Sequence, residues 1–209
     1  MIYLYFRIEK KKSEKLPVYY PESVQTVNAI GVEKKDSVYH TIPDFKFINQ
    51  NGDTITEEYF KNKIFVADFF FSTCPTICPK MMTQMERVND AEKARMDFLI
   101  ISHSVNPERD SVSALNEYAK KVHADGKKWM LVTGKKKDIY DIAMDGYKLP
   151  LSEDPREPEG FLHSSLFVLV DKEKRVRGYY DGTDSSKVNL LIHDIVVLSS
   201  EYSDTLAKP

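Results

Sequence analysis

Two cysteines are the residues of this chain best suited to chemistry. Cys74 and Cys78 are separated by Pro75, Thr76 and Ile77. If this segment opens a helix, the two side chains lie on one face, with their Cα atoms about 6 Å apart, which a disulfide tolerates. The same spacing lets two thiolates hold one metal ion, and a helix N-terminus favours a thiolate near neutral pH. The pair is predicted to be a metal site or a redox pair; a structural disulfide and two inert buried thiols are the alternatives.

The softness of the ligands decides which metal such a pair prefers. Two thiolates joined by one imidazole suit Cu(I), which accepts low coordination numbers. Structural zinc normally takes four protein ligands, and the sequence offers no convincing fourth. Copper is therefore the expected ion if the pair binds a metal.

The composition excludes some classes of function. The 209 residues include 30 basic and 32 acidic ones, for a net charge of −2, so no field of one sign is expected to attract nucleic acid. No apolar run is long enough to cross a bilayer. Residues 1–6 are apolar up to Arg7 and are interpreted as a frayed terminus or the remnant of a membrane anchor. Lys10, Lys11 and Lys12 would then lie on the outer side, against the usual bias of basic residues.

The remaining pattern predicts one domain after a short tail. Residues 1–22 are interpreted as the tail or linker and residues 23–209 as the domain. A turn at Asn49–Asp53 predicts a hairpin over residues 43–58, and the apolar run 64–71 predicts a strand buried on both faces. Later strands are predicted at residues 98–101, 129–132, 166–170 and 176–180. Helices are predicted at residues 78–95, 136–146 and 185–201, and one more helix is predicted to begin after Asp110, which would cap it.

After the hairpin, this order is β-α-β-α-β-α-β-β-α. It predicts an α/β protein with a mixed central sheet and helices on both faces. Cys74 follows the buried strand directly, at the carboxyl end where active sites of such sheets lie.

The cysteine segment also resembles a known family. Residues 68–79 (DFFFSTCPTICP), 101–110 (ISHSVNPERD), 129–134 (WMLVTG) and 163–165 (HSS) are similar to the Sco/SenC copper chaperones, across roughly residues 40–200. The resemblance implies a thioredoxin-like fold, to which the predicted hairpin is an N-terminal β-hairpin extension. It implies that Cys74, Cys78 and His163 bind Cu(I) or Cu(II).

The resemblance also implies a role and a location. Family members help to build the binuclear copper site of cytochrome c oxidase, by delivering copper, by reducing its cysteines, or both. A copper donor protein, a monomeric state and a membrane tether facing the periplasm or an equivalent extracytoplasmic compartment are expected with that role.

Two positions depart from the family pattern. Asn106 stands where the family usually has Asp, so a function that needs that acid is in doubt, although copper binding is expected to survive. His103 stands at a position that is usually apolar. Strand alternation groups it with Leu99, Ile101 and Val105, which predicts a core or near-surface residue and not a ligand.

Other candidate residues have competing interpretations. Asp68 precedes Cys74 by six residues inside the apolar run, so its pKa is expected to be raised; a proton-exchanging acid and a structural, hydrogen-bonded acid are equally favoured. Helical spacing interprets Met81 and Met85, in a segment that also holds Met82, as core. The histidines assigned no role are His40, His123 and His193.

Two other functions use the same cysteines. A dedicated thiol–disulfide oxidoreductase is the main alternative, although general reductases of this fold space their cysteines one residue closer. A peroxidase would need a nearby Arg, and none lies between Cys74 and Arg87, so it ranks last. Whether the chain is an enzyme stays open on the sequence alone.

Overall fold

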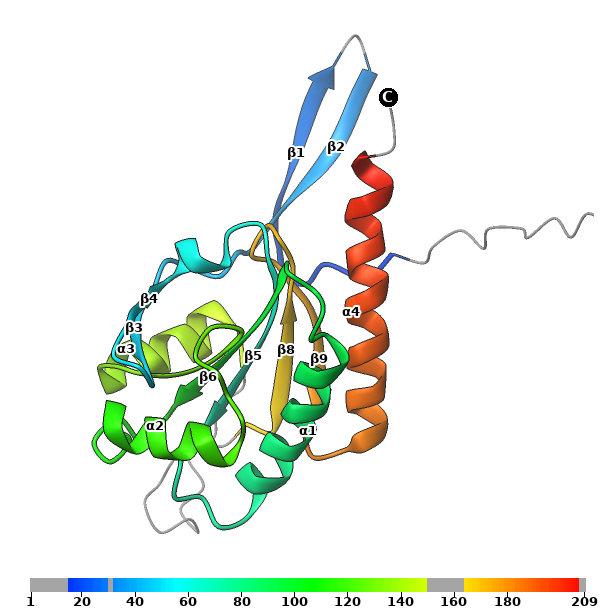
Figure 1. Ribbon diagram of the computed structural model, residues 1–209. Helices are drawn as coiled ribbons and strands as arrows, with labels where there is room; N and C mark the ends of the chain where they lie inside the picture. The colour runs from blue at the N-terminus through cyan, green and yellow to red at the C-terminus, as the bar shows by residue number, and fades with distance from the viewer. Residues whose placement is uncertain (1–14, 30–31, 150–163, 207–209) are drawn as a thin grey trace, which may run out of the picture.

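A computed structural model of the chain describes residues 15–29, 32–149 and 164–206 (Figure 1). Its centre is a seven-stranded sheet with the order β4-β3-β7-β6-β5-β8-β9. The pairs β5–β6 and β6–β7 are parallel, whereas the other neighbours are antiparallel. The sheet is therefore mixed, as predicted. Its strands are β3 (Lys46–Asn49), β4 (Thr54–Thr56), β5 (Ile64–Phe70), β6 (Phe98–Ser104), β7 (Trp129–Thr133), β8 (Leu166–Val170) and β9 (Val176–Asp181).

Helices cover both faces of this sheet. Phe69 and Phe70 are neighbours on β5 and so point to opposite faces. The Phe70 ring stacks on Tyr118 of α2, whereas the Phe69 ring contacts Tyr147, just after the π-helical turn η2. The α/β class and the order of elements are thus confirmed. The helical segments are η1 (Glu57–Phe60), α1 (Ile77–Ala91), α2 (Val112–Lys121), α3 (Lys136–Asp141), η2 (Ile142–Gly146) and α4 (Ser185–Leu206).

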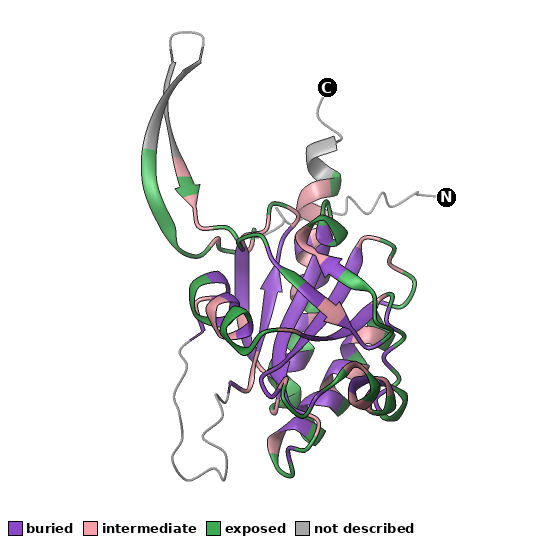
Figure 2. Cartoon of the chain, turned by 90° about the vertical axis from the view of Figure 1, so that its left-hand side faces the viewer, coloured by how far each residue is buried: buried purple, intermediate pink, exposed green. Residues whose placement is uncertain are grey.

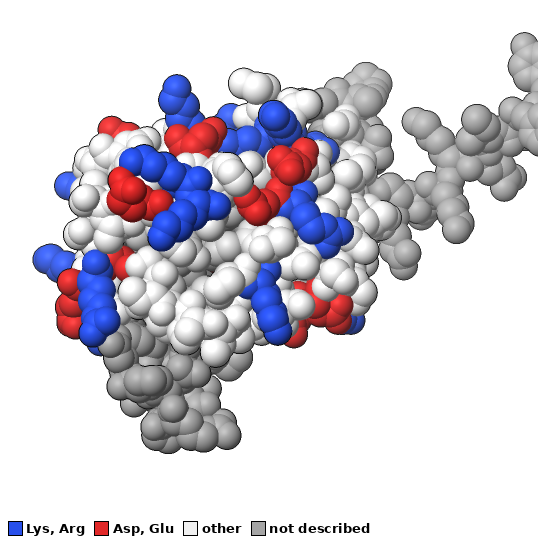
Figure 3. All heavy atoms as spheres, turned by 60° about the horizontal axis from the view of Figure 1, so that its bottom comes forward, with Lys and Arg blue, Asp and Glu red and all other residues white. Residues whose placement is uncertain are grey.

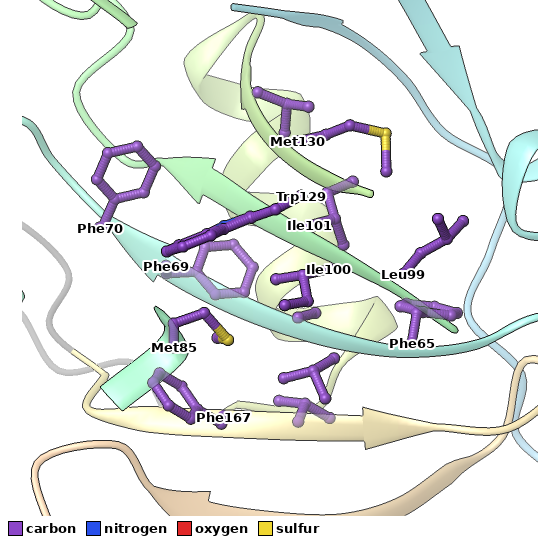
Figure 4. Close-up of a cluster of buried hydrophobic side chains, with 14 of the residues drawn as sticks. Phe65, Phe69, Phe70, Met85, Leu99, Ile100, Ile101, Trp129, Met130 and Phe167 are labelled. Carbon is purple, nitrogen blue, oxygen red and sulfur yellow. The ribbon is translucent and has the colours of Figure 1, made fainter. Parts of the chain in front are cut away.

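The core is centred on β5, every residue of which is buried (Figure 2). The strand lies between β6 and β8 and is covered on both faces, which explains its nearly continuous apolar sequence. Figure 4 shows Phe65, Phe69 and Phe70 of this strand among side chains that include Trp129 of β7 and Phe167 of β8. A fully buried strand therefore leads directly into the cysteine segment.

Two hairpins precede β5. The predicted hairpin over residues 43–58 is present as β3 and β4, and the Asn49 side-chain oxygen accepts from the Asp53 backbone N–H at 2.9 Å to close its turn. A second hairpin, β1 (Pro21–Ala29) with β2 (Val32–Tyr39), forms its own two-stranded sheet and projects from the body in Figures 1 and 2. An N-terminal hairpin extension was expected, but residues 21–39 were not singled out for it, because both strands are largely polar and lack a regular apolar alternation. The domain boundary near residue 23 stays a prediction.

Three helix ends differ from the sequence prediction, one of them that of α4, which runs to Leu206 and not to residue 201. Asp110 does not cap α2: Ser111 does, accepting from the Ala114 backbone N–H at 3.3 Å. Helix α1 ends at Ala91 and not at residue 95. The Lys128 ammonium binds the backbone carbonyls of Glu92, Lys93 and Arg95 just beyond it, which places a cation at the helix C-terminus.

A buried ion-pair network lies at the end of the sheet far from Cys74. Asp171 follows β8, which runs antiparallel to β5, so it lies beside the start of β5. Its carboxylate binds Arg177, whose guanidinium also binds Glu201 and the backbone carbonyls of Leu16 and Pro17. The network joins the first described residues to β9 and α4.

Within the described ranges, no helix combines the length and apolarity that a membrane span requires.

His103 lies in the core, as the strand alternation predicted. Its ring is fully buried and stacks on Phe69 at 4.8 Å between centroids, with Phe47 and Tyr147 at 5.2 and 5.5 Å. Its Nε2 has no hydrogen-bond partner within the described part of the chain. Burial lowers the pKa of His103 to about 3, while a hydrogen bond with the Asp68 backbone partly opposes the shift.

The buried histidine should make the fold sensitive to acid. The unfolded chain takes up a proton near pH 6.5 but the folded one only near 3, so stability present above pH 6.5 is lost as pH falls between them. Asp68 has the opposite slope, because its folded pKa is raised. His103→Leu removes only the histidine contribution. Relative to wild type, its free energy of unfolding in urea should rise by about 1.4 kcal/mol for each pH unit below about 6.

The exposed His193 provides the control, since its side chain is 69% accessible. His193→Gln should follow the wild-type pH profile. An unchanged difference between wild type and His103→Leu from pH 7.5 to 4.5 would contradict the buried, neutral histidine.

Candidate metal centre

The cysteine turn begins where β5 ends. The Cys74 backbone N–H donates to the Phe71 carbonyl at 3.2 Å, which turns the chain out of the sheet. Helix α1 starts at Ile77, so Cys78 lies in its first turn. The Cys78 backbone N–H donates to the Cys74 sulfur at 3.5 Å. The expected closeness of the two cysteines at a helix N-terminus is confirmed, although the helix begins only at Ile77. Both thiols are free and buried.

The two thiols differ in acidity. For Cys74, desolvation by burial is the largest influence and would raise the pKa, but hydrogen bonds from Cys78 and Thr76 together outweigh it and lower the pKa below its ordinary value. Burial raises the pKa of Cys78 far above its ordinary range, and the neighbouring Cys74 and Asp68 charges add to this. Cys74 is therefore the available thiolate, and Cys78 gives up its proton only when a cation or a disulfide replaces it.

Asp68 lies on β5, six residues before Cys74, and is fully buried. It accepts a short hydrogen bond from the Ser102 hydroxyl, which also accepts from the Trp129 indole N–H at 3.0 Å. Burial raises the pKa of Asp68 to about 7, and the Ser102 bond partly offsets the shift. Its other carboxyl oxygen has no partner among the described residues. The raised pKa expected from the sequence is thus confirmed.

A second buried carboxylate, that of Asp110, holds the cysteine turn. It accepts from the Ser72 backbone N–H at 3.1 Å and forms short hydrogen bonds with the Ser72 and Ser104 hydroxyls. An acid just before a helix is typical of a cap, so the sequence did not predict this role. The available signal was a serine at the end of each strand: Ser72, two residues after β5, and Ser104, the last residue of β6.

His163 lies outside the described residues, so its predicted position beside the cysteines stays a prediction. Extending the register of β5 and β8, in which Ala67 pairs with Val168, brings Ser164 level with Phe71. Ser164 is buried, and its hydroxyl accepts from the Leu166 backbone N–H at 3.2 Å. In the described ranges, no group of three His, Cys, Asp or Glu side chains could hold a metal.

The remaining candidates lie elsewhere. Met81 and Met85 are buried core residues, as predicted, and Met82 is buried as well. His40 contacts the Gly146 carbonyl, and His123 and His193 pair with surface carboxylates. Asn106 is buried in the loop after β6, where its backbone N–H donates to the Ser104 hydroxyl.

The surface around the turn carries little charge. No Lys, Arg, Asp or Glu occurs from residue 69 to residue 79. Figure 3 shows the end of the molecule that is at the bottom of Figure 1, where the β5–α1 turn lies; basic and acidic side chains are interspersed around an uncharged area. Among the residues that the structure describes, this face shows charges of both signs and no extended area of one sign.

A thioredoxin-like domain with two unequal thiols at the end of its central strand defines a class of thiol-based metal or redox proteins. The SCO1/SenC family model matches residues 33–196. The chain belongs to this family.

Solved structures agree with this assignment. A SCO1/SenC family lipoprotein from Bacillus anthracis is 28% identical with a TM-score of 0.68, covering 77% of this chain and 95% of that one. BsSco, described as a Sco family cytochrome c oxidase assembly protein with a disulfide switch, is 31% identical with a TM-score of 0.67, covering 79% and 96%. Copper-bound ScoI from Arabidopsis thaliana is 25% identical with a TM-score of 0.60, covering 73% and 96%.

The unequal thiols should react at different rates. In Cys78→Ser, iodoacetamide should alkylate Cys74 with a pH midpoint below that of an ordinary thiol, because hydrogen bonds stabilise its thiolate. In Cys74→Ser, Cys78 should react at least about tenfold more slowly at pH 7.5, because burial disfavours its thiolate. Mass spectrometry over a pH series measures both rates. Faster alkylation of Cys78 would contradict the assignment.

Proposed function

We propose that this chain is a copper metallochaperone that binds one copper ion through Cys74, Cys78 and His163. The observation that carries the proposal is the close approach of the cysteines, with the Cys78 N–H 3.5 Å from the Cys74 sulfur at the start of α1. Family membership adds support, since the Arabidopsis relative is a copper-bound Sco protein. Copper is cargo here, taken from a donor protein and passed on.

The residues present suit Cu(I) better than a harder ion. Thiolates are soft ligands, and the Cys74 pKa is already lowered. Binding replaces the Cys78 proton, so loading should release protons and strengthen as pH rises. The backbone N–H bond to Cys74 orients its sulfur before the ion arrives. An imidazole ligand would extend the same site to Cu(II), as the family resemblance implies.

His163 is proposed as the third ligand because of its place in the chain. Ser164 follows it directly and is the first described residue before β8. The register of β5 and β8 brings Ser164 beside the end of β5, from which the cysteine turn departs. A ligand at position 163 is therefore compatible with the topology.

The wider role is proposed from the relatives. BsSco is described as a cytochrome c oxidase assembly protein, so the recipient proposed here is the copper-site subunit of that oxidase. The Bacillus anthracis relative is a lipoprotein, which supports a membrane-tethered domain facing the periplasm or an equivalent extracytoplasmic compartment. Residues 1–22 would then be the tail leading to the tether and residues 23–209 the copper-binding domain, acting as a monomer without nucleic acid.

A second function, dedicated reduction of partner cysteines, is favoured by the unequal thiols. In this function the Cys74 thiolate, whose pKa is lowered, attacks a partner disulfide, and the Cys78 thiol then resolves the mixed disulfide. This step reduces the partner to a dithiol and oxidises Cys74 and Cys78 to a disulfide. Catalysed reduction of insulin disulfides in the presence of a reductant would indicate a general reductase. Without such catalysis, any reductase function would have to be dedicated to one partner.

Copper titration tests the three-ligand site. Anaerobic Cu(I) competition against a chromogenic chelator should give one ion per reduced wild-type chain. Cys74→Ala, Cys78→Ala and His163→Ala should each weaken binding by more than about tenfold, because each loses a ligand and about 1.4 kcal/mol or more. His193→Ala, at an exposed histidine, is the matched control and should bind as wild type does.

The outcomes separate the ligands from one another. If only His163→Ala binds normally, the site is a two-cysteine site and the histidine is structural. Wild-type affinity in all three variants would contradict the proposed function.

A further inference from the structure

We propose that Asp110 is a positioning residue for the cysteine pair. Its buried carboxylate holds Ser72, two residues before Cys74, and so fixes the turn in which both thiols meet one Cu(I) ion or close to a disulfide. The inference rests on the proposed function of this site. It adds a residue that binds no metal but sets how well the metal ligands are preorganised.

Asp110 binds Ser72 and Ser104 through three hydrogen bonds, and this set of bonds is called the clamp. The side chain has no exposed surface, and one carboxyl oxygen accepts from both the Ser72 backbone N–H and the Ser104 hydroxyl. The other oxygen accepts from the Ser72 hydroxyl. Three donors thus converge on an acceptor-only group. Because Ser72 is held at its backbone and at its side chain, its position and its orientation are both fixed.

The clamp is itself anchored in the fold. The Asp110 backbone N–H donates to the Asn106 carbonyl at 2.9 Å, and Ser111 begins helix α2 directly afterwards. Ser104 ends β6, whose next residue, Val105, donates to the Phe70 carbonyl at 2.8 Å. Asp110 therefore joins the ends of the two central parallel strands and α2 to the cysteine turn. A movement of Ser72 would have to break this set of bonds.

The consequence for the thiols follows from chain connectivity. Only Thr73 separates Ser72 from Cys74, and the Cys74 N–H is bonded to the Phe71 carbonyl on the other side of Ser72. Loss of the Asp110 carboxylate would leave the half-buried Ser72 N–H and hydroxyl and the buried Ser104 hydroxyl without their acceptor. Donors removed from bulk water do not stay unpaired, so the turn would rearrange to hydrate them. Cys74 would then spend less time beside the Cys78 N–H.

Asparagine should preserve much of the clamp. Its carbonyl oxygen can replace the carboxyl oxygen that accepts from the Ser72 N–H and the Ser104 hydroxyl. Its amide can donate to the Ser72 oxygen once that hydroxyl rotates. Alanine offers none of these contacts. Asp110→Asn is therefore the rescue variant for Asp110→Ala, and Ser72→Ala removes one contact from the opposite side.

Asp171 offers a matched control. It too is a buried carboxylate with several donors, including the Arg177 guanidinium at 3.1 Å and the Glu173 backbone N–H at 3.0 Å. It lies at the opposite end of the sheet from Cys74. Asp171→Ala should destabilise the fold to urea without altering the cysteine turn.

The test measures the thiol–disulfide equilibrium of the full chain in glutathione buffers, and separately its anaerobic Cu(I) affinity. In the first, the protein disulfide and two glutathione thiols exchange for the protein dithiol and one glutathione disulfide. Asp110→Ala should shift the equilibrium at least fivefold toward the dithiol and weaken Cu(I) binding about tenfold. Ser72→Ala should shift both in the same direction, and Asp110→Asn and Asp171→Ala should stay within twofold of wild type.

Each other outcome has a defined meaning. Values within twofold of wild type for Asp110→Ala and Ser72→Ala would overturn the proposal, as would an equal shift in Asp171→Ala, which would mark a general stability effect. If Asp110→Ala does not fold, Ser72→Ala decides. If wild type binds no copper, the proposed function fails, and the glutathione equilibrium still tests the positioning role.

Discussion

The structure depends on the burial of β5 between a parallel neighbour, β6, an antiparallel neighbour, β8, and helices on both faces of the sheet. All seven of its residues are buried, and each large apolar side chain contributes about 1.5–3 kcal/mol when removed from water. Together, these contributions outweigh the free-energy cost of burying the carboxyl group of Asp68, which is the only ionisable side chain on the strand. The buried strand therefore provides a fixed starting point for the turn that carries Cys74 and Cys78.

The end of this strand creates two unequal sulfur environments. Cys74 receives hydrogen bonds that favour its thiolate, whereas Cys78 is surrounded by the core and by nearby negative charge. One thiol is thus available before any partner arrives, and the other loses its proton only with the arrival of a cation or the closure of a disulfide. The same arrangement would suit either of the two proposed functions, copper transfer or dithiol chemistry, and so both proposals use the same residues.

Much of this could be predicted from the sequence, where local patterns determine the outcome. The unbroken apolar run of β5, the alternation that placed His103 in the core and the spacing of Cys74 and Cys78 all depend on near neighbours. The hairpin β1–β2 could not be predicted, because its strands are polar and its pairing depends on the chain folding back on itself. The role of Asp110 was missed for a related reason: its partner Ser72 lies 38 residues earlier, and only the sheet topology brings them together.

The central claim is that two sulfurs and one imidazole hold a single copper ion. Copper K-edge X-ray absorption on the Cu(I)-loaded full chain observes those ligands directly, including His163, which lies outside the described residues. The account predicts two sulfur neighbours and one nitrogen neighbour, with the nitrogen lost in His163→Ala and the two sulfurs retained. A spectrum with sulfur ligands alone in wild type, or one unchanged by His163→Ala, would contradict it.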